Sequence, residues 1–447
     1  MTRWLIALTV LLFGALALGH GIAANDQTPP GNSPAGKAQP SAPSPPCGEL
    51  GTIVTQPSVD PQRFCPEYLV EALPRSALAA ITSITYAPAC EALQEPNAWC
   101  GALFFVRPDE GTLMWIGPYD SGTRSYPLHT FASGLNTPNG LVWHAGSWYV
   151  AGDQTVYRLT DEDGDGSADR RELLVQNLPH GEGYWTGSIG VGPDGRLYVS
   201  KGAGCNACPE GDSRRASILS YRLDGSDEQV FASGLRHAFD FAWHPASSDL
   251  WVGESSRNDL GEDTPLDELN RITGPGQHFG WPYCYTTPDG VVMDRTVPGA
   301  DPVLCQEATG PALTFTAHSS PAGMAFYHGA AFPEFEGDLL LVAQGSWNRR
   351  IPSGYALYRI CFDERGGLET CLDADGNPLE DEWGNPTSQE RLIPVDPFYE
   401  YGLEVLHIQG QSFYPDHPVD VAVSPEGWIA LSIMEGRVIQ VRPSPGG

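Results

Sequence analysis

The stretch Ile189-Gly-Val-Gly-Pro-Asp-Gly-Arg-Leu-Tyr-Val-Ser200, followed by Ser217-Ile-Leu-Ser-Tyr-Arg-Leu223, decides the fold. A Pro-Asp-Gly turn joins two apolar runs of strand length, and a third run follows after a connection. Short apolar runs separated by such turns are typical of antiparallel sheets and not of helices. The stretch therefore predicts one small antiparallel sheet.

The same unit recurs on both sides of this stretch. The other copies lie at 140–159, 241–252, 324–360 and 421–441, with an irregular first copy at 81–116. Six such sheets, with no convincing amphipathic helix between them, predict an all-β fold, a six-bladed β-propeller over residues 47–447. We expect functional residues in the longer connections, at about 160–185, 201–216, 253–283, 343–356 and 398–418.

Composition agrees with a large turn-rich globular protein. The 447 residues are 41% hydrophobic, which excludes a mostly disordered chain, and 51 glycines with 40 prolines argue against a helical protein. The formal net charge of -30 disfavours nucleic acid as a partner, because a phosphate backbone would be repelled. An acidic surface suits cation binding, but it also simply keeps an exported protein soluble.

The first residues predict export. Arg3 precedes an apolar run from Trp4 to Leu18, and small residues follow at 21–24, which is typical of a secretory signal peptide over residues 1–24. A Pro/Ser-rich linker is expected over residues 25–46. The predicted location is therefore secreted, either extracellular or periplasmic. An uncleaved N-terminal anchor is the alternative, and no later segment resembles a membrane span.

Ten cysteines follow the predicted signal, and an even number in an exported chain favours disulfides. They fall in pairs that are close in sequence, so five local bridges are the simplest prediction. The expected pairs are Cys47–Cys65, Cys90–Cys100, Cys205–Cys208, Cys284–Cys305 and Cys361–Cys371. The Cys205-Asn-Ala-Cys208 pair is alternatively a redox motif or half of a zinc site.

An acidic loop follows the second copy of the repeat. The segment 161–172 has acidic oxygens at positions 1, 3, 5, 9 and 12 of the EF-hand pattern and Gly166 at position 6. The predicted ligands of Ca²⁺ are Asp161, Asp163, Asp165, Ser167, Asp169 and Glu172. Because strands flank the loop, we expect a stabilising calcium site; a surface hairpin without an ion is the alternative.

Several segments together resemble the glucose/sorbosone dehydrogenase family, which consists of soluble six-bladed propellers that bind pyrroloquinoline quinone (PQQ) and calcium. This family includes the pyranose and aldose sugar dehydrogenases. The segments that carry the resemblance are 190–200, 205–208, 214–219, 231–237, 242–245, 267–271, 279–282, 317–327, 345–349 and 418–422. They occur in the family's order and cover most of the chain from about 130 to 442.

The resemblance implies oxidation of a sugar or alcohol, with hydride transfer from a hydroxyl-bearing carbon to PQQ. It implies cofactor contacts from Arg236, His237, Gln344, Asn348, Arg349, Lys201 and Arg257. The backbone of 254–259 matches the segment that holds the cofactor's calcium. The chain has no CxxCH motif for haem, so we expect a separate electron acceptor.

The chain departs from the family at the predicted site. Tyr184 stands where the family has a histidine that acts as the base, and tyrosine is ordinarily a poor base at neutral pH. His180, in the same connection, is the second candidate for the catalytic base. His237 replaces an asparagine, Gln344 a histidine and His417 an arginine. Either the site is adapted to another substrate or cofactor, or hydride transfer is lost.

Two other functions therefore remain open. One is a catalytically degraded propeller that binds a carbohydrate or a protein, for which Tyr184, Trp185, Trp281, Tyr283 and Trp347 provide aromatic surface. The other is a calcium-dependent hydrolase or lactonase. The chain has neither a nucleophile elbow nor a GxGxxG turn after a strand, so serine hydrolase and nicotinamide chemistry are not expected. The substrate and the oligomeric state stay open.

Overall fold

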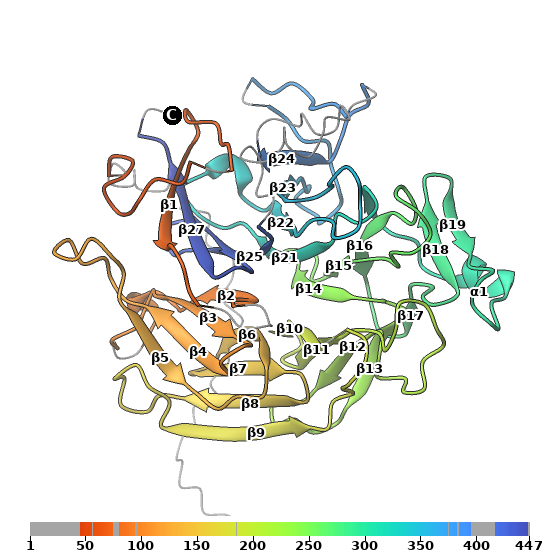
Figure 1. Cartoon of the computed structure of the whole chain (residues 1–447), viewed down its shortest axis with the longest axis horizontal. Helices are drawn as coiled ribbons and strands as arrows, with labels where there is room; N and C mark the ends of the chain where they lie inside the picture. Colours follow the sequence, from red (N-terminus) through yellow and green to blue (C-terminus); the bar gives the residue numbers. More distant parts are fainter. Residues whose placement is uncertain are drawn as a thin grey trace, which may run out of the picture. The chain divides into compact units, whose positions relative to one another are not determined.

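Six antiparallel sheets of the computed structural model are arranged around a common centre, which confirms the predicted six-bladed β-propeller (Figure 1). In chain order, the first blade consists of β2 (Ser83–Tyr86), β3 (Leu103–Arg107), β4 (Thr112–Ile116) and β5 (Leu128–Ala132). The second consists of β6 (Pro138–His144), β7 (Ser147–Gly152), β8 (Thr155–Thr160) and β9 (Arg170–Gln176). The third consists of β10 (Thr186–Val191), β11 (Leu197–Lys201), β12 (Ser217–Tyr221) and β13 (Gln229–Ser233).

The remaining three blades follow the same order. The fourth blade consists of β14 (Ala238–Trp243), β15 (Leu250–Glu254), β16 (Asp267–Ile272) and β20 (Leu313–Phe315). The fifth consists of β21 (Pro321–Phe326), β22 (Leu339–Ala343), β23 (Ala356–Ile360) and β24 (Gln389–Ile393). The sixth consists of β25 (Pro418–Val423), β26 (Ile429–Ile433), β27 (Arg437–Pro443) and β1 (Phe64–Val70). Outside the blades lie β17 (Gln277–His278), which extends the third sheet, the hairpin β18 (Cys284–Thr287) and β19 (Gly290–Met293), and the short helices η1 (Cys90–Ala92), α1 (Pro302–Glu307) and η2 (Pro333–Phe335).

The structure describes residues 45–55, 57–74, 80–93, 97–184, 186–373, 375–381, 384–394 and 416–445, with only the backbone of Thr186. The chain divides into the units Met1–Pro40 and Ser41–Gly447, and everything described belongs to the second. The predicted signal peptide, almost all of the predicted linker, Trp185 and most of the connection 398–418 lie outside the described residues. In the part that is described, no helix has the length and hydropathy of a membrane span.

The ring closes through the N-terminal strand. The innermost strands β2, β6, β10, β14, β21 and β25 each contact the next, and β25 contacts β2. The antiparallel pairing of β1 with β27 completes the last blade, from Phe64 opposite Pro443 to Val70 opposite Val438. Behind this seam Arg442 forms an ion pair with Glu67, and both side chains are 0% exposed. Closure thus joins the two ends of the described chain.

The hydrophobic core is divided among the seams between blades. One cluster joins the first two blades through Phe104 and Trp148, whose rings are 4.2 Å apart and fully buried, and similar clusters fill the other seams. Each blade therefore buries both faces, which explains why many of its strands are solid apolar runs instead of alternating ones.

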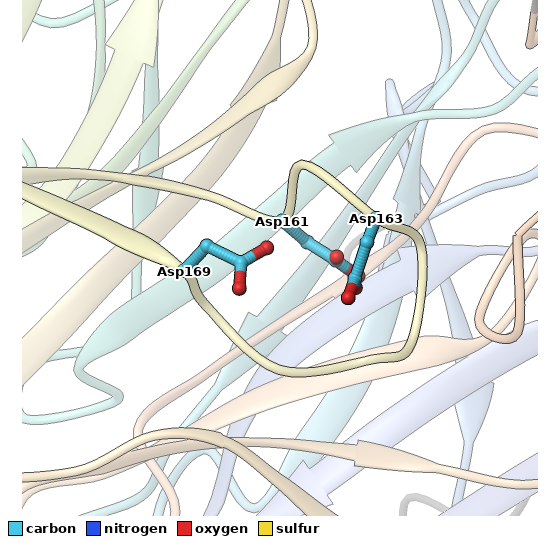
Figure 2. A group of neighbouring side chains, drawn as sticks. All are labelled: Asp161, Asp163 and Asp169. Carbon is cyan, nitrogen blue, oxygen red and sulfur yellow. The ribbon is translucent and has the colours of Figure 1, made fainter.

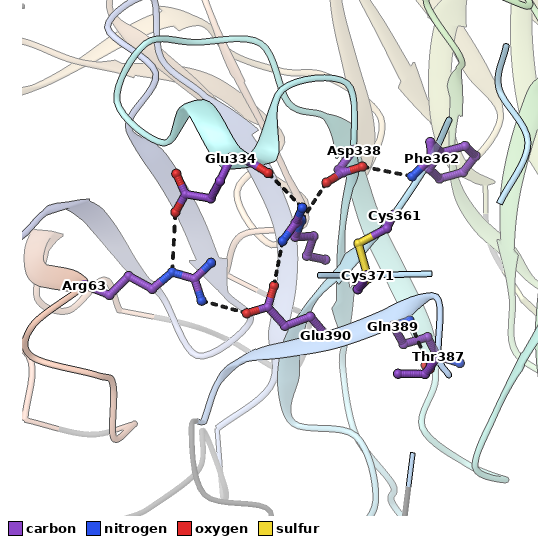
Figure 3. Close-up of a disulfide and its surroundings, with 10 residues drawn as sticks. Arg63, Glu334, Asp338, Cys361, Phe362, Cys371, Thr387, Gln389 and Glu390 are labelled. Carbon is purple, nitrogen blue, oxygen red and sulfur yellow. Dashed lines mark hydrogen bonds and ion pairs between the residues drawn. A yellow bond between two sulfur atoms is a disulfide. The ribbon is translucent and has the colours of Figure 1, made fainter. Parts of the chain in front are cut away.

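All five predicted disulfides are present, and the described residues include no free cysteine. The Cys361–Cys371 bridge braces the fifth blade beside an ion-pair network (Figure 3). There Arg63 pairs with Glu334 and Glu390, so the segment before β1 is held to the neighbouring blade. The bridging role of Cys205–Cys208 is confirmed.

A central channel of about 450 Å³ is lined by the innermost strands. Two carboxyl groups lie in its wall, that of the half-buried Asp240 and that of the buried Asp420. Asp240 accepts a hydrogen bond from the backbone N–H of Met324 at 2.8 Å, and Asp420 accepts one from Ile84 at 2.8 Å, so each carboxyl binds the inner strand of the next blade. Burial raises the pKa of Asp240 to about 6 and raises that of Asp420 well above its ordinary value.

Candidate active site

The predicted site residues gather at one face of the propeller because the strand registers align there. Thr186 lies opposite Lys201, Ala238 opposite Glu254, Pro321 opposite Ala343, and Pro418 opposite Ile433. The connections that leave these positions therefore emerge at the same edge of four neighbouring blades. We call this edge the site face.

Arg236 lies at this face, in the turn between β13 and β14. The residue is only 2% exposed. Its Nε donates to the carbonyl of Asn206 at 3.1 Å, and its two terminal nitrogens donate to the carbonyl of Ser255 at 2.8 Å, to Oδ1 of Asn206 at 2.7 Å and to the hydroxyl of Tyr184. All of these acceptors are neutral, and no carboxylate in the described part of the chain forms an ion pair with Arg236. Arg236 is thus a buried cation without a direct anionic partner.

His237 lies against the same tyrosine. Its ring stacks on Tyr184 with centroids 4.7 Å apart and an interplanar angle of 28°. Burial, together with the charges of Arg236 and Lys201, lowers the pKa of His237 to about 3, so its imidazole is neutral. Its Nε2 is buried and has no hydrogen-bond partner in the described residues. Such an atom can bind a ligand without breaking an existing contact.

Lys201 supplies a second buried cation. The chain has two lysines, Lys37 and Lys201, and Lys201 is 0% exposed at the end of β11. Its Nζ lies 3.4 Å from a carboxylate oxygen of Asp153. Burial lowers the pKa of Lys201 to about 8, and Asp153 opposes this shift. The amine therefore changes charge close to neutral pH.

Three asparagines connect Arg236 to the β22–β23 connection. Oδ1 of Asn206 accepts from Arg236 and, at 3.3 Å, from the backbone N–H of Asn258. The carbonyl of Asn258 accepts from Nδ2 of Asn348 at 2.7 Å. Sequence reasoning missed Asn206 because each interpretation of its CxxC motif, as a disulfide, a redox motif or half of a zinc site, concerned the cysteines alone. A polar residue enclosed between two bridged cysteines was the available signal.

Arg349 is engaged more fully than its neighbour Arg350. The guanidinium of Arg349 donates to the carbonyls of Ala317 and Ile351, each at 3.1 Å, and to Asp263 at 3.1 Å. Arg350 is exposed and makes no hydrogen bond or ion pair with any described residue. It is therefore the available cation of this connection, and sequence reasoning passed over it. Gln344 uses its backbone N–H to bind Ser320, and no contact of its side chain is present in the described part.

Arg257 is directed away from Arg236. Its guanidinium binds both carboxylate oxygens of Asp259, at 2.7 and 2.9 Å, and also Asp294 and the hydroxyl of Thr296. These contacts leave it tied to the β18–β19 hairpin. The structure thus does not bring Arg257 together with Arg236, although the next residue, Asn258, lies in the asparagine chain.

Buried acids lie beneath Arg236 in the fourth blade. Glu254 accepts from the backbone N–H of Arg236 at 2.6 Å, and the side chain of Asn270 donates to Glu254 at 3.1 Å and to Glu268 at 3.0 Å. Burial raises the pKa of Asp267 to about 7 and raises those of Glu254 and Glu268. A raised pKa favours the neutral carboxyl, so these acids offset the charge of Arg236 only in part.

The two candidate bases differ in position. Tyr184 is half-buried, and its backbone N–H donates to the carbonyl of Ala203 at 2.7 Å, which holds it over Arg236. His180 is exposed, and its carbonyl accepts from Arg215 at 2.6 Å. No contact between the His180 imidazole and the Arg236 cluster is present in the described residues. The geometry thus brings Tyr184, and not His180, to the cluster.

The acidic loop lies at the other face of the propeller. The β8 strand begins near Asp153 at the site face, so its far end leads into the loop, and β9 follows the loop as the predicted second flanking strand. Figure 2 shows that Asp161, Asp163 and Asp169 converge, and ligand oxygens of the three lie within 4.8 Å of one another. Asp161 also accepts from Trp99 Nε1 at 2.7 Å, which ties the loop to the first blade.

The other predicted ligands of the loop differ in their contacts. Glu172 lies in β9, where it forms ion pairs with Arg158 and Arg170. Asp165 accepts from the backbone N–H of Ser167 at 2.8 Å. The structure thus brings three of the six predicted ligands together and directs Glu172 toward its neighbouring arginines. An ion held here would be remote from Arg236.

Comparison with known proteins gives a family and a fold. The model of the family described as TrAA12-like matches residues 130–380, more than half of the chain. A curated relative from Borreliella burgdorferi, described as an uncharacterized protein, is 31% identical over 155 residues. That match spans 34% of this chain and 39% of the relative, so the chain covers well under half of the relative's length.

Two solved structures share the fold. A Trichoderma reesei protein of carbohydrate-active enzymes family AA12 superposes with a TM-score of 0.67 and 19% identity, over 88% of this chain and 99% of that one. The holo form of the PQQ domain of pyranose dehydrogenase from Coprinopsis cinerea has a TM-score of 0.63 and 16% identity, over 85% and 95% of the two chains. At these identities the likeness establishes the propeller fold alone.

Proposed function

Because the chain belongs to the TrAA12-like family, we propose that it is a dehydrogenase that uses PQQ and calcium to oxidise a hydroxyl group of a sugar or similar polyol. The observation that carries this proposal is Arg236, a buried cation bound only by neutral oxygens. Burying a charge without an anionic partner is costly, and an anionic ligand would remove that cost. PQQ has three carboxylates and a quinone.

The donors at the site face fit such a ligand. Arg236 and Lys201 are buried cations that can face carboxylates, and Nε2 of His237 is buried and free to bind a quinone oxygen. Asn348 and Arg350, on the β22–β23 connection, can contact the part of the ligand nearer to solvent. When bound, the quinone accepts two electrons and the carbon-bound hydrogen of the sugar as a hydride.

The protein's own contribution would be proton transfer and charge stabilisation. Tyr184 is the proposed base that takes the proton from the sugar hydroxyl, and Arg236, which donates to the Tyr184 oxygen, would stabilise negative charge on that oxygen during this step. The stack on His237 fixes the phenol plane. His180 remains the second candidate base, but its imidazole could reach the substrate hydroxyl only if the connection that carries it rearranges.

Calcium enters the proposal at two places. The carbonyl oxygens of the 254–259 segment are hard ligands of the kind that calcium prefers, and Ser255 already directs its carbonyl into the site toward Arg236. The acidic loop 161–172 is the second place, with Asp161, Asp163, Asp165, Ser167, Asp169 and Glu172 as proposed ligands. There the ion would stabilise the seam between the first two blades and would take no part in the reaction.

The proposed cellular setting is export to an extracellular or periplasmic location, where five disulfides would persist. Electrons would leave the reduced cofactor for a separate acceptor. A net charge of -30 argues against nucleic acid as a partner.

A non-catalytic carbohydrate-binding propeller is the second candidate function, and one observation favours it. Trp347 is 66% exposed, yet its ring lies flat on His417 with centroids 3.9 Å apart and an interplanar angle of 6°. A pinned, exposed aromatic ring is a surface on which a sugar can stack. This role requires no cofactor.

The decisive experiment is reconstitution of the purified protein with PQQ and Ca²⁺, followed by absorbance spectra and dye reduction with a panel of sugars. A spectral change with sugar-dependent dye reduction is expected. The matched variants are Arg236→Gln and Arg365→Gln, the latter at an exposed arginine whose side chain makes no hydrogen bond or ion pair with a described residue. Loss of cofactor binding only in Arg236→Gln supports the proposal, provided that circular dichroism confirms folding. Absence of cofactor binding by the parent protein refutes it.

A further inference from the structure

A second cavity lies on the outer side of the fourth blade. It has a volume of about 650 Å³ and is bounded by the β15–β16 connection and the β18–β19 hairpin. Leu260, Tyr285, Val292 and Met293 provide apolar and aromatic surface, and Thr264 and Arg295 provide polar groups. This volume is in the range of small-molecule sites, about 300–1,000 Å³. None of the candidate active-site residues lines this cavity.

The cavity is preformed, because its walls are joined at both ends. At one end the backbone N–H of Leu266 donates to the carbonyl of Thr286 at 3.0 Å. At the other end Arg257 binds Asp294, a pair of side chains that are 8% and 2% exposed. The Cys284–Cys305 disulfide holds the base of the hairpin. A ligand therefore meets an ordered cleft and need not create it.

Two consecutive residues, Arg257 and Asn258, connect this cleft to the candidate active site. Arg257 binds Asp294 and Thr296, both of which line the cleft. The next residue, Asn258, is in contact with Asn206 and Asn348 of the site. The cleft and the candidate active site are therefore neighbours along the chain, joined at Arg257 and Asn258.

The lining selects for a particular chemistry. The hydroxyl of Tyr285, the hydroxyl of Thr264 and the guanidinium of Arg295 have no partner in the described residues, so they are free to bind hydroxyl groups. Asp289 and Arg295 carry opposite charges, which favours neither a polyanion nor a polycation. A pyranose ring has an apolar C–H face and a rim of hydroxyls, which matches a lining of one aromatic ring, apolar side chains and isolated polar groups.

From these observations we propose that the cleft is a subsite for a neutral oligosaccharide, so that the substrate is a sugar chain whose oxidised ring lies at the site face. The inference rests on the proposed function for the position of the oxidised ring. Binding of the further rings in the cleft needs no cofactor. The two proposals are therefore tested separately.

The test measures binding to the full-length protein without cofactor, by isothermal titration calorimetry. Its probes are glucose, cellobiose, cellotriose, maltose and maltotriose. We expect at least one trisaccharide to bind about tenfold more tightly than glucose. Tyr285→Ala removes this gain because it deletes the ring, and Tyr285→Phe retains most of it because it deletes only the hydroxyl. Leu173→Ala, at an exposed leucine of β9, is the control and leaves affinity unchanged.

Each outcome decides the proposal. Equal affinity for glucose and every oligosaccharide, or no binding of any oligosaccharide, overturns it. A length-dependent gain that survives in correctly folded Tyr285→Ala also overturns it, because the contact then lies elsewhere. If oligosaccharides bind in a Tyr285-dependent manner but the PQQ-reconstituted protein reduces no dye, the subsite stands and the proposed dehydrogenase activity falls. If the PQQ-reconstituted protein reduces dye but oligosaccharides do not bind in a Tyr285-dependent manner, the dehydrogenase proposal stands and the subsite proposal falls.

Discussion

The guanidinium of Arg236 lies over the ring of Tyr184, with its central carbon 4.2 Å from the ring centroid, and donates a hydrogen bond to the Tyr184 hydroxyl. The two residues are 52 positions apart in the chain, one in the connection before the third blade and the other in the turn after it. This pair joins a phenol oxygen to a buried cation at the place where the family pattern has a histidine. It is the arrangement on which the proposed chemistry depends.

The first prediction concerns the Tyr184 hydroxyl. Tyr184→Phe keeps the ring that stacks on His237 and removes only the oxygen that Arg236 contacts. If that oxygen accepts the substrate proton, kcat of the reconstituted enzyme falls by about 100-fold or more, while PQQ affinity changes little. Dye-reduction kinetics and a cofactor titration measure the two quantities. Unchanged kcat would make His180 the base, and His180→Ala then becomes the informative variant.

The second prediction concerns the pH dependence of stability. The pKa of Asp240 is raised to about 6 and that of Asp267 to about 7, whereas exposed aspartates titrate near 4. Because the folded chain binds these protons more tightly than the unfolded chain does, stability falls as pH rises from about 4 through 7. Thermal melting between pH 5 and 8 should therefore give a lower Tm at the higher pH.

Asp240→Asn isolates one contributor to the slope of Tm against pH. The amide oxygen can still accept from Met324 and no charge forms beside Asp420, so Tm at pH 8 should rise and the slope should flatten. Asp224→Asn is the control, since Asp224 is exposed and hydrogen bonds to Ser226 lower its pKa out of this range. A slope that Asp240→Asn leaves unchanged would assign the pH dependence to other groups.

The third prediction concerns the acidic loop. If Ca²⁺ binds there, EDTA lowers Tm by about 3 °C, since a site occupied at 100 times its Kd adds about 2.7 kcal/mol of stability. Asp163→Asn should abolish most of the difference between Ca²⁺ and EDTA. Trp99, whose indole N–H contacts Asp161, should report binding by fluorescence. Asp375→Asn, in another acidic turn, is the matched control and should respond to EDTA as the parent protein does. If Asp163→Asn also responds to EDTA as the parent protein does, the stabilising calcium binds elsewhere.

The fourth prediction concerns ring closure. Glu67→Gln leaves the fully buried Arg442 without its counter-charge, and breaking a buried pair in this way costs about 3–5 kcal/mol. The midpoint of urea unfolding should therefore move to a lower urea concentration. Arg170→Gln is the comparison, because the Arg170 side chain is 58% exposed and forms a surface ion pair with Glu172. Its loss should lower the free energy of unfolding by less than about 1 kcal/mol. Similar costs for the two variants would mean that the β1–β27 seam is not held by this pair.

Much of the architecture could be predicted because it depends on local pattern. The strand–turn–strand unit at 189–200 forms β10 and β11 as expected, since a Pro-Asp-Gly turn and two apolar runs specify a hairpin without outside information. The five disulfides were predictable for the same reason, because each joins cysteines no more than 21 residues apart. Neighbours in sequence are neighbours in space when a short loop connects them.

The sequence by itself therefore determined the repeat, the blades and the bridges, together with the set of polar residues from which a site is built. Only the closed ring decided which of those residues meet. It placed Arg236 against Tyr184 and Asn206, directed Arg257 to Asp294, and put the acidic loop at the opposite face. Such contacts depend on the curvature accumulated over several blades and on the rotamers chosen in a crowded turn, and neither quantity is encoded in any single stretch of residues.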